Sequence, residues 1–77
     1  EVPVVSCSYD FVSEAGHLLL RRYPEAPFAA CVVYAYGNAS VSLRSEDSRE
    51  DVSKIAVKNG GGGHRNAAGF KIEGSAL

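Results

Sequence analysis

The stretch from 28 to 45 constrains the fold more than any other part of the chain. Its first half, FAACVVYAY at 28–36, is nearly all apolar, β-branched and aromatic, which predicts a strand buried on both faces. Gly37-Asn38 follows and suits a two-residue hairpin turn, because glycine accepts positive φ freely. ASVSLRS at 39–45 then alternates, which predicts a second, antiparallel strand. Its two faces are Ala39, Val41 and Leu43 on one side and Ser40, Ser42 and Arg44 on the other.

The chain before this hairpin predicts a short strand and an amphipathic helix. VPVVS at 2–6 is β-branched, with Pro3 tolerable near a strand start or on an edge. YDFVSEAGHLLLRRYP at 9–24 has a helical period, Ser8 or Asp10 can cap its start, and Pro24 blocks its continuation. The apolar stripe expected to face the core consists of Phe11, Val12, Ala15, Leu18 and Leu19.

The chain after the hairpin predicts a second helix and a last strand. In the polar connector SEDSRED at 45–51, Ser48 and Asp51 resemble a capping box, and Asp51 can itself cap. A short helix then runs to about Asn59, with an apolar face of Val52, Ile55 and Ala56. AAGFKIE at 67–73 supplies the final strand. The order β-α-β-β-α-loop-β predicts an α/β (α+β) fold, in which a small mixed sheet with a hairpin is flanked by two helices as a single domain over 1–77.

Composition limits the class of protein. With 45% hydrophobic and 22% charged residues, the 77-residue chain is typical of a folded soluble domain. A net charge of −1 argues against a strongly basic duplex clamp but allows a local basic site. The chain contains no Met and no apolar run like a signal peptide or membrane span, so we expect an excised, cytoplasmic domain with no membrane partner. Cys7 and Cys31 stand apart, which argues against zinc; Cys31 is expected in the core.

The glycine-rich segment KNGGGGHRNAAGF at 58–70 is the main functional candidate. A helix stop accounts for Gly60 and at most Gly61, while each further glycine costs about 0.5–1 kcal/mol relative to Ala. Glycines let backbone N–H groups approach a phosphate or a flat base. The segment matches neither Walker A nor the dinucleotide fingerprint, because it follows a predicted helix and precedes a strand.

Positive and hydroxyl side chains lie within reach of this segment. Because a helix C-terminus disfavours anions, a bound anion would need His64, Arg65 or Lys58, with Arg44 if its strand is a neighbour. Taken singly, each arginine is also consistent with a solvated surface position. Tyr34, Tyr36 and Phe70 could stack on a base, although core packing is favoured for each.

At these residues the sequence resembles the DHH-associated domain of DHH-family phosphoesterases, such as RecJ-like exonucleases, nano-RNases and cyclic-dinucleotide phosphodiesterases. The resemblance rests on SLRS at 42–45, DVSKIAVKN at 51–59 and GGGGHRNAAGF at 60–70, in the family's order, and covers about 28–73. It implies a substrate-binding domain, with Arg44 contacting phosphate and the Gly61-Gly62-Gly63-His64 loop gripping substrate. Ser42 and Ala67-Ala68-Gly69 extend the match. Adding Arg65 as a neighbouring cation, the expected site residues are Ser42, Arg44, Gly61, Gly62, Gly63, His64 and Arg65.

The resemblance also implies what lies outside this chain. Such a parent enzyme holds Mn or Mg in an N-terminal catalytic domain of the same chain, and the two domains grip a short single-stranded oligonucleotide or a dinucleotide between them. The Asp-His-His signature is missing here, so the chain is expected to hold no metal or catalytic residue of its own. Two alternatives stay open: a polyphosphate- or pyrophosphate-binding relative, and a non-catalytic tRNA-associated or interaction module. Whether the parent is a homodimer is also open.

Overall fold

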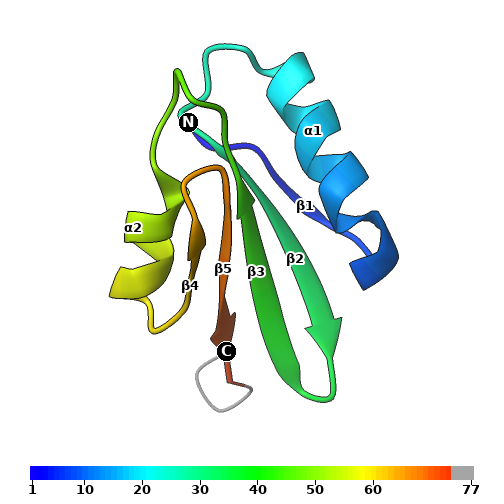
Figure 1. Cartoon of the computed structure of the whole chain (residues 1–77). Coiled ribbons are helices and arrows are strands. Elements are labelled where there is room, and N and C mark those ends of the chain that lie inside the picture. The colour runs from blue at the N-terminus through cyan, green and yellow to red at the C-terminus, as the bar shows by residue number, and fades with distance from the viewer. Residues whose placement is uncertain (74–77) are drawn as a thin grey trace.

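The structure, a computed structural model, describes residues 1–73. Its elements are β1 (Val4–Ser6), the 3-10 turn η1 (Tyr9–Phe11), α1 (Val12–Arg22), β2 (Ala29–Ala35), β3 (Asn38–Arg44), α2 (Val52–Lys58), β4 (Gly62–His64) and β5 (Ala67–Ile72). The strands form one sheet in the order β1-β2-β3-β5-β4 (Figure 1). β1 is parallel to β2 and the other pairs are antiparallel. The predicted mixed sheet with two helices is therefore confirmed.

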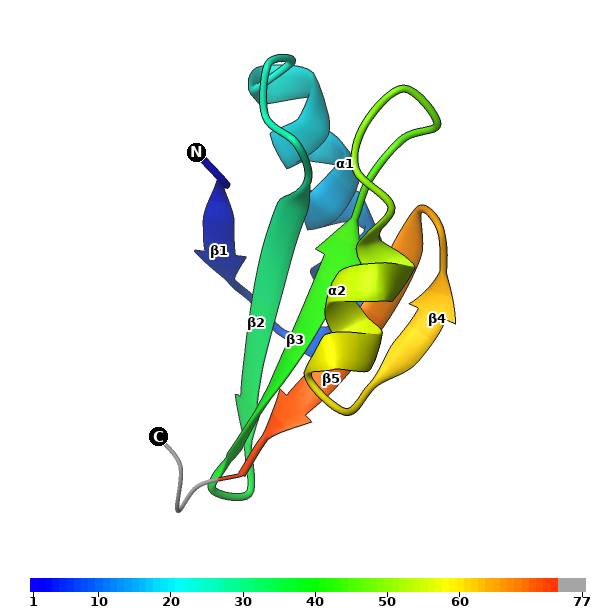
Figure 2. The ribbon, with the colours of Figure 1, turned by 90° about the vertical axis from the view of Figure 1, so that its left-hand side faces the viewer.

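The two helices lie on opposite faces of the sheet. Figure 2 shows α2 in front of the strands and α1 behind them. On the α1 side, the buried Cys31 thiol donates a hydrogen bond to the carbonyl oxygen of Val12, 3.6 Å away. This confirms the core position expected for Cys31. The core beneath α2 consists of Ala30, Leu43, Val52, Ala56 and Ala68.

The predicted hairpin is confirmed, but its turn lies one residue earlier than expected. β2 and β3 are joined by Tyr36-Gly37, and both residues have positive φ, 53° and 77°, as a type I′ turn requires. In this register Leu43 pairs with Ala30. A turn at Gly37-Asn38 would have set Leu43 opposite the larger Val32, which would fit less well because facing core positions alternate large and small residues.

The expectation that 28–36 is buried on both faces is wrong for its second half. Residues 29–31 are buried, whereas Tyr34 is 66% exposed and Tyr36 is fully exposed. The tip of the hairpin projects beyond both helices, which leaves these rings in solvent (Figure 1). Core packing is therefore wrong for the two tyrosines, while Phe70 packs against the core as expected.

The first helix presents a different face to the sheet than its apolar pattern predicts. Phe11 and Leu18, both expected in the core, are 57% and 50% exposed. The residues that α1 buries are Val12, Gly16 and Leu20. The difference arises because Gly16, which has no side chain, lets the helix axis come close to the sheet. The buried face is therefore centred on this glycine.

The predicted N-terminal cap is wrong for the first helix, and Asp51 is confirmed as the cap of the second. The residues before η1 and α1, Ser8 and Phe11, make no side-chain cap bond, so the predicted cap at Ser8 or Asp10 is wrong. At α2, Asp51 accepts a hydrogen bond from the Ser53 backbone N–H at 3.0 Å, which confirms Asp51 as the cap. The capping box of Ser48 and Asp51 is wrong, because the helix begins at Val52, directly after Asp51. Within residues 1–73, no helix is long and apolar enough to cross a membrane.

The end of α2 follows the predicted glycine stop. Gly60 has a φ of 84°, and its N–H donates to the Val57 carbonyl oxygen at 3.1 Å. The next N–H, of Gly61, donates to the Ala56 carbonyl oxygen at 2.8 Å. Together these two bonds form a Schellman motif. The helix-stop interpretation is therefore confirmed for the first glycine, and the backbone of the second completes it.

The glycine segment differs from the expected loop, because its second half is a strand. β4 pairs with β5 through a two-residue turn at Arg65-Asn66, so the fold has one more strand than predicted. Glycine is disfavoured in strands and carries no alternating side-chain pattern. The ladder to β5 across the Arg65-Asn66 turn therefore defines this strand, and no side-chain pattern within the glycine segment does.

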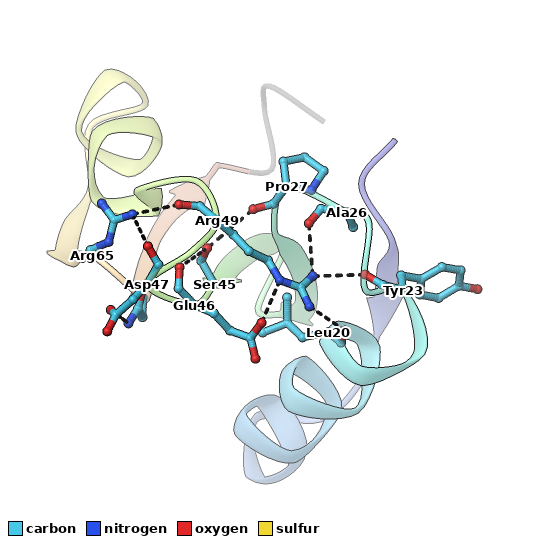
Figure 3. Close-up of polar contacts among 10 residues, drawn as sticks. Leu20, Tyr23, Ala26, Pro27, Ser45, Glu46, Asp47, Arg49 and Arg65 are labelled. Atoms are coloured by element: carbon cyan, nitrogen blue, oxygen red, sulfur yellow. Dashed lines mark hydrogen bonds and ion pairs between the residues drawn. The ribbon is translucent and has the colours of Figure 1, made fainter.

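Arg49, in the connector between β3 and α2, ties that connector to the end of α1 (Figure 3). Its guanidinium donates hydrogen bonds to three carbonyl oxygens near the end of α1 and pairs with the Glu46 carboxylate at 2.7 Å. The arginine side chain is only 11% exposed. The Leu20 carbonyl is one that the end of α1 leaves without an intrahelical partner, whereas the Tyr23 carbonyl also accepts a hydrogen bond from the Ala26 N–H at 3.1 Å. The acceptors belong to Leu20, Tyr23 and Ala26.

Candidate functional site

The α1 side of the sheet carries the candidate site, because α1 packs mainly on β2 and β3 and leaves β5 and β4 beside it. Register partners in a sheet direct their side chains to the same face. One row across β3, β5 and β4 is Arg44, Ala67 and His64, and the next is Ser42, Gly69 and Gly62. Ser40 and Lys71 form a third row. We call these eight residues the open face.

Arg44 lies at the boundary between the open face and α1. Its guanidinium donates to the Leu43 carbonyl oxygen at 3.1 Å and to the Ser13 hydroxyl at 3.4 Å. A guanidinium has five N–H donors, so these two bonds to described residues leave three for a ligand. Arg44 is therefore both oriented by α1 and able to pair with an anion.

Gly16 makes room for the stem of Arg44, a role that the sequence interpretation missed. A Cβ atom built on Gly16 would lie 2.5 Å from Cγ and 3.1 Å from Cβ of Arg44. A side chain in this position would displace the arginine or the helix. The signal was available in principle, because a glycine inside an apolar helix costs about 1 kcal/mol relative to Ala and calls for a packing reason.

The three glycines predicted to bind substrate have different surroundings. Cβ atoms built on Gly61 and Gly63 would overlap β5: that of Gly61 meets the carbonyl oxygen of Gly69, and that of Gly63 lies 2.5 Å from Cα of Ala68. Gly63 also has a φ of 144°. Gly62 is different, since a Cβ there meets no atom of the described residues within 4 Å. Gly62 therefore leaves space on the open face, whereas its neighbours allow close packing between strands.

His64 is the last residue of β4 and is exposed. Its row places it two strands away from Arg44, a separation of about 10 Å between the two backbones. Ala67 lies between them and leaves the space above the sheet free of a large side chain. A ligand several atoms long can therefore touch both the imidazole and the guanidinium.

Arg65 lies apart from the other predicted site residues. Its guanidinium donates to the carbonyl oxygens of Asp47 and Arg49 at 2.9 and 2.8 Å, as Figure 3 shows. It also lies 3.8 Å from the Asp51 carboxylate. These bonds give Arg65 a structural role, because they hold the connector against the β4–β5 turn. Its role as a ligand residue is not supported by this position and stays a prediction.

A groove of about 760 Å³ extends toward the hairpin tip and is lined by four open-face residues, Ser40, Ser42, Gly69 and Lys71, together with Val41 and Phe70 of the same two strands. Gly60 and Gly61, at the end of α2, also line it. The side chains that end it near the tip are Asn38, Lys71 and Glu73. Arg44 and His64 stand beyond the opposite end, one row from Ser42. The two basic residues are therefore neighbours of the groove in the sheet and are not part of its lining.

Two titratable groups have shifted pKa values for clear physical reasons. Burial, and secondarily the nearby Cys7, raises the pKa of the Cys31 thiol above its ordinary 9.0. The hydrogen bond from Ser53 lowers the pKa of the Asp51 carboxyl. Both cysteines are free thiols. Among residues 1–73, no group of three or more His, Cys, Asp or Glu side chains could hold a metal ion.

By fold and site, the chain is a small α+β domain with a polar, small-residue sheet face left open beside a helix. No family model matches it. In sequence it is 45% identical over 69 residues to uncharacterized protein R106 of Acanthamoeba polyphaga mimivirus. It is 40% identical over 60 residues to oligoribonuclease NrnB of Bacillus subtilis (strain 168). These alignments cover 87% and 78% of the chain. The chain spans only 16% and 14% of these relatives.

Two solved structures share the fold. An uncharacterized protein from Helicobacter pylori G27 matches 92% of the chain with a TM-score of 0.72 and 35% identity. The pGpG-specific phosphodiesterase PggH from Vibrio cholerae matches 73% of the chain with a TM-score of 0.59 and 21% identity, which establishes a likeness of fold alone. The matched regions are 19% and 21% of those chains. The chain is thus related in sequence to a segment of an oligoribonuclease and in fold to part of a phosphodiesterase.

Proposed function

We propose that the chain is the DHH-associated, nucleotide-binding domain of a metal-dependent phosphoesterase that hydrolyses short oligonucleotides or dinucleotides. The sequence relationship to oligoribonuclease NrnB supports this assignment, as does the shared fold with a phosphodiesterase named for pGpG. The match to GGGGHRNAAGF at 60–70 supports it from the residues themselves. The catalytic domain, with its Mn or Mg ion, would lie elsewhere in the parent chain.

The observation that carries the proposal is the register of the open face. Arg44, Ala67 and His64 are partners in one row, so two basic side chains from distant parts of the sequence share one surface. The adjacent row is neutral and small: Ser42, Gly69 and Gly62. A nucleotide combines a charged phosphate with a flat neutral base. The charged row suits the phosphate and the small row suits the base or sugar.

Each residue then has a definite task in binding. Arg44, held by Ser13, offers its remaining N–H donors to phosphate oxygens. Gly62 allows the ligand to approach the backbone closely, and the Ser42 hydroxyl can donate or accept a hydrogen bond. His64 supplies a second polar contact from the edge strand. A ligand of this type would be read through its backbone and stacking surface, with little base preference.

Calorimetric titration of the 77-residue chain tests the proposal. We expect a 5′-phosphorylated dinucleotide to bind with a Kd of about 1 mM or below. It should bind more tightly than tripolyphosphate, because polyphosphate has no base or sugar to contact the row of Ser42, Gly69 and Gly62. Arg44→Met and His64→Ala should weaken binding. Arg22→Met and His17→Ala, which change exposed residues of the same types on α1, are matched controls. Equal affinity for tripolyphosphate, or losses as large in the controls, would contradict nucleotide binding at this face.

A further inference from the structure

Lys71 and Ser40 lie in the half of the groove that is nearer the hairpin tip, away from Arg44. They are register partners on β5 and β3, and both line the groove. Lys71 is exposed, and its ammonium makes no ion pair with any described residue. Opposite partners in a sheet have Cβ atoms about 5 Å apart. The ammonium and the hydroxyl can therefore hold the same small anion.

The charges along the groove follow a definite order. Arg44 and His64 stand at one end, and Lys71 stands four residues farther along, a backbone distance of about 14 Å. Between them lies the neutral row with Ser42. Beyond Lys71 the groove ends at Asn38 and the carboxylate of Glu73. The order is positive, neutral, positive, negative.

We propose that Lys71, with the hydroxyl of Ser40, binds a second phosphate group of the nucleotide ligand, and that Glu73 limits how far the ligand's charge can extend. This inference rests on the proposed function and adds a subsite to it. The flexible four-carbon stem of Lys71 lets its ammonium lean toward Ser42 and adjust to the ligand. Lysine binds phosphate as a point charge, so the subsite recognises charge and not base identity.

The carboxylate of Glu73 gives the subsite a direction. A third phosphate placed beyond Lys71 would face this negative side chain, and like charges repel. The groove therefore favours a ligand with two phosphates over one that carries a third in this direction. The preference is for the number of charged groups and applies equally to ribose and deoxyribose ligands.

The salt dependence of binding tests the subsite, using pApA and the full 77-residue chain. Each phosphate contact with a single strand contributes about 0.7 to the slope of log K against log salt. We expect Lys71→Met to weaken binding about fivefold and to reduce this slope by about 0.7. Lys54→Met is the control, because Lys54 is an exposed lysine that lines a different hollow. It should leave both quantities unchanged.

The outcomes separate the two proposals. If pApA binds the wild type but Lys71→Met keeps the wild-type slope, the second subsite is wrong and the proposed function stands. If pApA does not bind the wild type, both proposals fall. Glu73→Gln supplies an independent arm: it should strengthen binding of pApApA at least threefold relative to pApA, and an unchanged ratio would overturn the role of Glu73. Thermal melts of each variant confirm that it is folded.

Discussion

Replacing Gly62 and Gly63 by alanine should have opposite effects on stability, although they are neighbours in β4. An alanine at Gly62 needs no unusual backbone conformation, and its Cβ meets no described atom within 4 Å. An alanine at Gly63 would have to adopt a φ of 144°, with its Cβ 2.5 Å from Cα of Ala68. Gly62→Ala therefore only reduces the conformational freedom of the unfolded chain. Gly63→Ala does this too, but it also strains the backbone of the folded chain.

The magnitudes follow from these geometries. A compatible Gly→Ala change stabilises a protein by about 0.4–1 kcal/mol through the entropy of the unfolded chain. In a domain of this size that is a rise in Tm of about 2–8 °C. A residue forced into a sparsely populated conformation costs about 1–3 kcal/mol, so Gly63→Ala should lower Tm by about 4–24 °C. The two substitutions are therefore expected to shift Tm in opposite directions.

Thermal unfolding followed by circular dichroism measures both effects, and the dinucleotide titration adds a functional readout. Gly62→Ala should be as stable as the wild type or more stable, yet bind pApA at least tenfold more weakly, because its methyl group occupies the open face. Gly63→Ala should have a lower Tm than the wild type. If Gly62→Ala were destabilised as much as Gly63→Ala, the assignment of Gly62 to open space would be refuted. Unchanged binding by Gly62→Ala would refute its role in ligand approach.

Three further predictions concern the residues around the site. Gly16→Ala should reduce pApA affinity with little change in Tm, because the helix gains about 1 kcal/mol in propensity while its new methyl displaces Arg44. Arg49→Met should destabilise the chain by about 2–4 kcal/mol in urea titrations, since it removes a donor from three carbonyl oxygens, of which only that of Tyr23 keeps another, the Ala26 N–H; a loss below about 0.5 kcal/mol would contradict the role of Arg49 in holding the connector to α1. At pH 8 a thiol reagent should label Cys7 quickly and Cys31 only as fast as the chain unfolds.

The raised pKa of Cys31 also sets a direction for stability against pH. The folded-state pKa lies above that of the unfolded thiol, so the contribution of Cys31 is fully present below about pH 9. It is lost as the pH rises through the folded-state pKa. Cys31→Ala should remove this alkaline loss, and a melt series from pH 8 to 10.5 would detect it. An unaltered alkaline loss in the variant would assign that loss to other groups.

The hairpin was predictable because its pattern is local. Ala39, Val41 and Leu43 alternate with polar residues, and this period alone determines which side faces the core. The same pattern placed Ser42 and Arg44 together on the other face. The turn was less predictable, because Gly37 suits more than one turn position and the fit of Leu43 against its partner in β2 decides the register.

The parts that depend on tertiary contacts were not predictable in the same way. In α1, three successive leucines allow more than one apolar stripe, and the contact between Gly16 and Arg44 selects the buried one. β4 carries no periodic signal, since Gly62 and Gly63 have no side chains. The place of Arg65 depended on carbonyl groups of a connector whose path the sequence does not specify. The site was therefore predictable as a set of residue types, and the division of roles among its glycines was not.

Chemical-shift mapping tests the central claim, nucleotide binding at the open face, most directly. The ¹⁵N-labelled 77-residue chain is titrated with pApA, and amide shifts are followed residue by residue. We expect the largest changes at Ser42, Gly62, His64 and Gly69, with little change at Ile55 on α2, which packs on the opposite face. Shifts confined to α2, or no shifts at about 1 mM ligand, would contradict it.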